Sequence, residues 1–125
     1  MSNRFLSRIV ALLICCAFSG LAHAASATLI AKLEALPEPV IVNQFYECSL
    51  RVSDAGGAGL PGLLLRVRGR MPEHAHGLPT LPQITDEGQG NYRIKGLSFN
   101  MPGHWVIEIL HDDKPMLRQE LTVRF

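Results

Sequence analysis

Two short stretches of this 125-residue chain combine methionine, proline and histidine: MPEHAHG at 71–77 and MPGHW at 101–105. Imidazole nitrogen binds zinc, copper, iron or nickel, and thioether sulfur favours copper, especially Cu(I). In an extended segment, His74 and His76 face the same side with their Cα atoms about 7 Å apart. Calcium and magnesium prefer oxygen ligands, and the two stretches supply only Glu73. The pattern therefore predicts a copper-type metal site with the candidate ligands Met71, His74, His76, Met101 and His104.

The same residues also have a structural interpretation. Met71 continues the apolar phase of Val67, and Met101 continues that of Phe99, as core residues do. A histidine pair in a loop is often only polar surface, and His104 is placed where it could cap a turn. A site forms only if the two Met-Pro corners meet at one pole of the fold.

Catalytic patterns are absent from the sequence. It contains no GxSxG, no HExxH, no GxGxxG and no phosphate-binding loop. Cys48 lies in the middle of an alternating segment on its apolar side, which is typical of a small buried hydrophobe. We therefore expect no enzyme; a small metalloenzyme with an open coordination position, using Glu73, is the weakest alternative.

The N-terminus has the pattern of a secretory signal. Arg4 and Arg8 precede the apolar run 9–22, and Ala22-His23-Ala24 fits the small-x-small cleavage rule. Residues 1–24 are therefore predicted to be a signal peptide, and residues 25–125 a single periplasmic or secreted domain; a retained membrane anchor is the alternative. After cleavage, ten basic and eleven acidic residues remain, so charge gives no reason to expect binding to nucleic acid or anionic lipid.

The sequence of the mature chain predicts a series of short strands, which would position the loops at the two Met-Pro corners. Prolines interrupt every window long enough for a helix, and apolar residues alternate with polar ones between them. Gly96 lies where the alternation changes phase, as a bulge requires. The pattern predicts an all-β, immunoglobulin-like antiparallel sandwich of about seven strands, with a small barrel as the alternative. The predicted strands are 28–36, 40–52 (as one strand or two), 62–71, 81–86, 91–99, 104–111 and 116–124.

The segment from Met71 to Ile109 resembles the YtkA-like domain, which is related to FixH-like proteins. The shared features are Met-Pro-x-His-x-His-Gly at 71–77, Gly-x-Tyr at 90–92 and Gly-Leu-x-Phe-x-Met-Pro-Gly-x-Trp at 96–105. This resemblance implies an exported immunoglobulin-like domain associated with copper handling and cytochrome oxidase assembly, with Met71, His74, His76 and Met101 as metal contacts. His104 stands where the family often has another residue, and Leu78 replaces an expected methionine.

Two functional hypotheses follow. The first is an exported copper-binding or copper-delivery protein that passes the ion to a protein partner, as in respiratory oxidase assembly. The second is a non-catalytic structural or interaction module without metal, in which the Met-His corners serve packing and an exposed sheet edge pairs with a partner.

Overall fold

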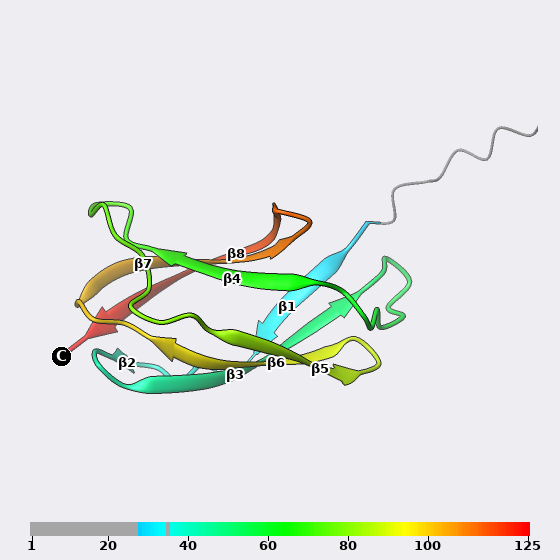
Figure 1. Ribbon diagram of the computed structural model, residues 1–125, viewed down its shortest axis with the longest axis horizontal. Helices are drawn as coiled ribbons and strands as arrows, with labels where there is room; N and C mark the ends of the chain where they lie inside the picture. The colour runs from blue at the N-terminus through cyan, green and yellow to red at the C-terminus, as the bar shows by residue number, and fades with distance from the viewer. Residues whose placement is uncertain (1–27, 35) are drawn as a thin grey trace, which may run out of the picture.

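The computed structural model describes residues 28–34 and 36–125, which form two facing β-sheets (Figure 1). The predicted signal peptide, residues 1–24, lies outside this part of the chain, in which no helix able to cross a membrane occurs. The described strands are β1 (Ile30–Glu34), β2 (Val40–Ile41), β3 (Phe45–Ser53), β4 (Leu65–Arg70), β5 (Gln83–Gly88), β6 (Asn91–Ser98), β7 (Gly103–His111) and β8 (Lys114–Arg124).

The strand order is that of an immunoglobulin-like sandwich. One sheet has the order β1-β3-β6-β5 and the other the order β2-β8-β7-β4. All neighbouring strands are antiparallel except β2 and β8, which run parallel. The two layers confirm the predicted sandwich, and the alternative of a closed barrel is not observed.

The predicted strand at 40–52 is divided between the two sheets. Val40 pairs with Val123 in one sheet, whereas Phe45 pairs with Ser98 in the other. Asn43 lies between them with a φ of 58°, a left-handed conformation that a continuous strand does not adopt. The chain therefore changes layer at this turn, which raises the number of described strands to eight.

The core lies between the sheets and is formed by the inward side of each alternating strand. Its largest fully buried side chains include Trp105, Tyr92 and Phe99. β7 is buried on both sides: Val106, on its outer side between its register partners Arg70 of β4 and Glu120 of β8, is as fully buried as Trp105 on its inner side. The continuous apolar run in β7 therefore reflects a central strand.

Gly96 occupies the bulge that the phase change predicts. Tyr46 pairs with Leu97 and Glu47 pairs with Lys95, so Gly96 has no partner residue in β3. Its φ is +83°, a conformation that favours glycine. The bulge turns the end of β6 so that Leu97 and Phe99 both reach the core, and so directs the chain into the second Met-Pro corner.

Candidate functional site

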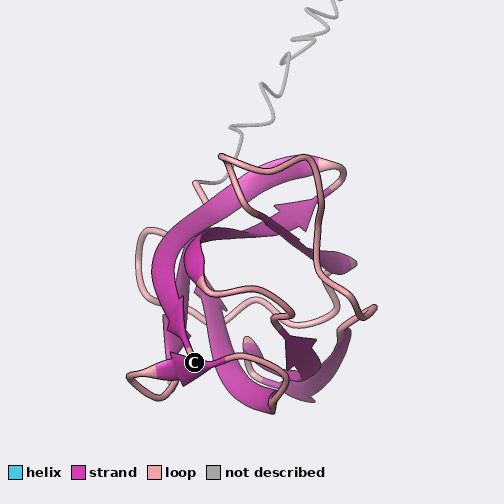
Figure 2. Cartoon of the chain, turned by 90° about the vertical axis from the view of Figure 1, so that its left-hand side faces the viewer, coloured by secondary structure: helices cyan, strands magenta, loops and turns pink. Residues whose placement is uncertain are grey.

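The two Met-Pro corners meet at one pole of the sandwich, which Figure 2 views end-on. A Cβ atom added to Gly103 in the second corner would lie only 3.0 Å from the Cε of Met71 in the first corner. The geometric condition for a shared site is therefore met. We call residues 71–77 together with residues 101–105 the Met-His corner.

The first half of the Met-His corner is a loop closed on itself. The backbone N–H of His74 donates to the Met71 carbonyl at 3.2 Å, and the N–H of Met71 donates to the His76 carbonyl at 3.4 Å. Arg70 and Gly77 form a bridge at the base of this loop. These backbone contacts fix the segment of main chain from which the side chains of His74 and His76 project.

The two imidazoles lie beside each other, and one of them packs on the core. The ring centroids of His74 and His76 are 5.9 Å apart, and the His76 ring meets Trp105 edge-on with a centroid distance of 5.7 Å. The Nδ1 atom of His76 is 3.4 Å from the Gly77 carbonyl oxygen, whereas its Nε2 atom is buried and has no hydrogen-bond partner among the described residues. A buried nitrogen without a partner is uncommon in proteins.

Trp105 joins the two halves of the Met-His corner. Its indole N–H donates to the Met101 carbonyl at 2.9 Å, and its ring meets Phe99 edge-on with a centroid distance of 5.2 Å. Because His76 packs on the same indole, this one fully buried side chain orients both loops. Both loops are thereby attached to the core.

The two sulfur-bearing side chains differ in burial. Met71 is only 3% exposed and belongs to the core cluster. Met101 is partly buried and packs against that cluster. Met71 therefore does what its apolar phase predicts, and its thioether fills space beside Gly103.

His104 is separated from the other four candidate ligands. Trp105 faces the core, and successive side chains of a strand point to opposite sides, so His104 lies on the outer side of β7. There its Nε2 atom is 3.3 Å from a carboxylate oxygen of Glu120. Arg118 and, after it, His104 lower the pKa of Glu120 through hydrogen bonds to the carboxylate. The structure thus brings Met71, His74, His76 and Met101 to one pole but gives His104 a different partner.

Acidic and thiol groups do not complete the Met-His corner. Glu73 is exposed, and within residues 28–34 and 36–125 no three His, Cys, Asp or Glu side chains are close enough to hold one metal ion. Cys48 is buried as predicted, and burial raises the pKa of its thiol to about 11. A histidine pair with thioether sulfur is therefore the ligand set that this corner can offer.

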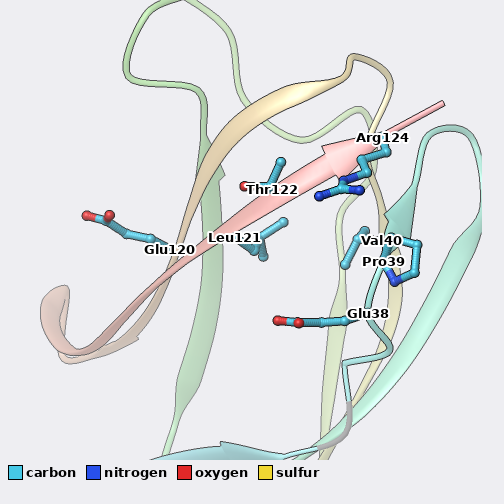
Figure 3. Close-up of a pocket in the computed structure, with 7 residues that line it drawn as sticks. All are labelled: Glu38, Pro39, Val40, Glu120, Leu121, Thr122 and Arg124. Carbon is cyan, nitrogen blue, oxygen red and sulfur yellow. The ribbon is translucent and has the colours of Figure 1, made fainter.

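A hollow of about 500 Å³ lies beside β8 (Figure 3). No sequence motif marks its position. It lies between β8 and the chain that leads into β2. The residues that line it are Glu38, Pro39, Val40, Glu120, Leu121, Thr122 and Arg124. The hollow exists because β2 is only two residues long and leaves most of the β8 edge uncovered, a consequence of strand order that no local pattern reveals.

Comparison with known proteins supports the fold and leaves function open. No family model matches the chain, and no curated protein is similar to it. Among solved structures, the filamin domain of Lin-41 is 14% identical, with a TM-score of 0.54 over 75% of this chain and 91% of that chain. Domains 4 and 5 of the S-layer protein SbsC are 17% identical, with a TM-score of 0.55 over 79% of this chain.

Invasin, a bacterial integrin-binding protein, is 19% identical, with a TM-score of 0.58 over 79% of this chain. The chain spans 54% of the SbsC domains and 20% of invasin. At these identities the likeness establishes an immunoglobulin-like β-sandwich.

Proposed function

We propose that this chain is an exported, non-catalytic interaction module in which the Met-His corner is a packing device that closes one pole of the sandwich. The observation that carries this proposal is the burial of Met71, 3% exposed, against Gly103 of the opposite loop. The packing of His76 on Trp105 supports the same role. The sandwich fold, which the chain shares with an integrin-binding protein, is consistent with partner binding.

Thermal unfolding with and without copper tests this proposal. If the Met-His corner serves packing, Met71→Ala lowers the Tm because it leaves a cavity in the core. Excess Cu(I) under reductant then leaves the Tm of the wild-type protein unchanged, since a ligand stabilises only the state that it binds. A rise in Tm on adding Cu(I), absent when His74 and His76 are both alanine, would overturn the proposal.

A second candidate function, copper binding and delivery, is favoured by one specific observation. Among the described residues, the Nε2 atom of His76 is buried without a hydrogen-bond partner, next to a second imidazole and at the pole where the two Met-Pro corners meet. Met71, His74, His76 and Met101 would hold the ion, and its release to an oxidase-assembly partner would follow by ligand exchange. The resemblance to YtkA-like domains supports this candidate.

Isothermal titration with Cu(I) tests the second candidate. Binding should weaken in acid, because imidazole coordinates a metal ion only in its neutral form. The matched control is the protein in which His104, on the outer side of β7, is replaced by alanine; it should bind as the wild type does. Equal binding by the wild type and by the His74→Ala, His76→Ala double variant would end this candidate.

A further inference from the structure

β4 is the end strand of its sheet and has a free edge. It pairs along its length with β7 on one side. On its other side, the described residues contribute only the single bridge between Arg70 and Gly77. An open edge of this kind presents backbone donors and acceptors to any chain that lies alongside.

The register identifies which backbone groups face outward. The N–H of Met71, directly after β4, donates to the His76 carbonyl on the free side of the strand. Backbone groups of an antiparallel strand alternate between its two sides, so Leu65, Val67 and Gly69 direct their N–H and C=O groups to this same side. The Gly69 carbonyl already lies against Gly77, so the open stretch of the edge is at Leu65 and Val67. The even-numbered residues Arg66 and Arg68 then form the ladder with β7.

A groove follows this edge. One hollow of about 330 Å³ is lined by Leu65, Arg66, Val67, Arg68, Leu81, Pro82 and Leu110. A second, of about 160 Å³, shares Arg66 and Leu110 with it but lies towards the β7–β8 hairpin, where Asp112 and Asp113 also line it. Two leucines near the groove are unusually open for apolar side chains: Leu64 is 82% exposed and Leu81 is 94% exposed.

The charges along β4 indicate what kind of partner fits. Arg66, Arg68 and Arg70 occupy alternate positions on the outer side of the strand. Asp113 pairs with Arg66 and Glu108 with Arg68, while Arg70 has no carboxylate partner among the described residues. A second copy added edge to edge would bring two such rows together, and like charges on paired strands repel. An acidic segment paired with β4 would instead place opposite charges beside these arginines.

We propose that the free edge of β4 binds an extended, acidic segment of a partner protein, which adds as a further strand to this sheet. The inner side chains of the segment would be apolar and contact Leu81 and Pro82. Its outer side chains would be acidic and face the arginines, since successive side chains of a strand alternate. This inference rests on the proposed interaction module and names its surface and the chemistry of its partner.

A peptide library with alternating apolar and charged positions, displayed on phage, tests the proposal. Selection against the full chain should enrich aspartate and glutamate at the charged positions. Val67→Pro removes one outward N–H and should weaken a selected peptide about twofold to tenfold, the loss expected for a main-chain hydrogen bond. The matched control Val67→Ala keeps the N–H and should retain most of the binding.

A second variant keeps the test independent of folding. Leu81→Asp alters a side chain that is 94% exposed, so it should leave the Tm unchanged and still weaken binding by a similar factor. Phe45→Asp, at a position that is 74% exposed on β3, is its control and should bind normally. Amide exchange should also show that bound peptide protects the N–H of Val67.

The outcomes separate this inference from the proposed function. Peptides that are basic at the charged positions, or that bind Val67→Pro and Leu81→Asp as well as the wild type, overturn the β4 assignment while leaving a binding module. Failure of the library to yield any binder overturns the strand-addition inference. The proposed packing role of the Met-His corner is tested separately, by thermal unfolding with and without copper, which this selection does not measure.

Discussion

The Met-His corner and the free edge of β4 show opposite relations between residue type and availability. The Met-His corner contains the residues with the most distinctive chemistry, yet Met71 is buried and His76 packs on Trp105. The β4 edge contains ordinary residues, three arginines and one valine among them, yet its backbone and two nearby leucines are open. Residue type thus identifies candidate chemistry, but burial and strand order decide which groups can reach a partner.

The largest predicted effect concerns the buried Met-His corner. Met71→Ala should lower the free energy of unfolding by about 2–5 kcal/mol, the usual range for truncating a buried methionine. Met116→Ala is the matched control, because Met116 is only partly buried at the start of β8, and it should cost less. Urea unfolding followed by tryptophan fluorescence measures both, and equal losses would contradict a special packing role for Met71.

The contact between the two corners can be measured by a double-mutant cycle. Gly103→Ala should destabilise the protein by about 1–3 kcal/mol, because Gly103 has a φ of +127° and its new Cβ would meet Met71. When Met71 is already alanine, the same change should cost less, since the clashing methyl group is gone. Additive losses in the cycle would show that the two corners do not touch.

The pKa of Cys48 gives a third, smaller effect. Burial raises the pKa of this thiol to about 11 in the folded protein, whereas an exposed thiol ionises near pH 8.5. Its contribution to stability is therefore complete below about pH 8.5 and declines as the pH rises towards 11. Ellman's reagent at pH 8 should label the native protein far more slowly than the urea-unfolded protein, and equal rates would contradict the burial.

The smallest predicted effect concerns His104. His104→Ala removes an exposed contact with Glu120, so the Tm should change little at neutral pH. Because Arg118 and His104 lower the pKa of Glu120, the stabilising contribution of that carboxylate is present above its unfolded pKa and is lost as the pH falls through the folded value. A large loss of stability in His104→Ala near pH 7 would contradict its assignment to the outer side.

Local alternation predicted the sandwich, the Gly96 bulge and the burial of Cys48, because each depends on neighbouring residues. The outward position of His104 could also have been read from the sequence, because the apolar residues Trp105, Ile107 and Ile109 alternate and His104 has the opposite parity. The division of 40–52 was harder, because it depends on Val40 pairing with the distant Val123. The free edge of β4 could not be predicted, since strand order is a property of the whole sheet.

Thermal unfolding with excess Cu(I) under reductant tests the central claim, that the Met-His corner serves packing, most directly. The account predicts an unchanged Tm for the wild-type protein and a lowered Tm for Met71→Ala, with or without copper. A copper-dependent rise of several degrees, as binding at about 100 times Kd would produce, that disappears in the His74→Ala, His76→Ala double variant would contradict it.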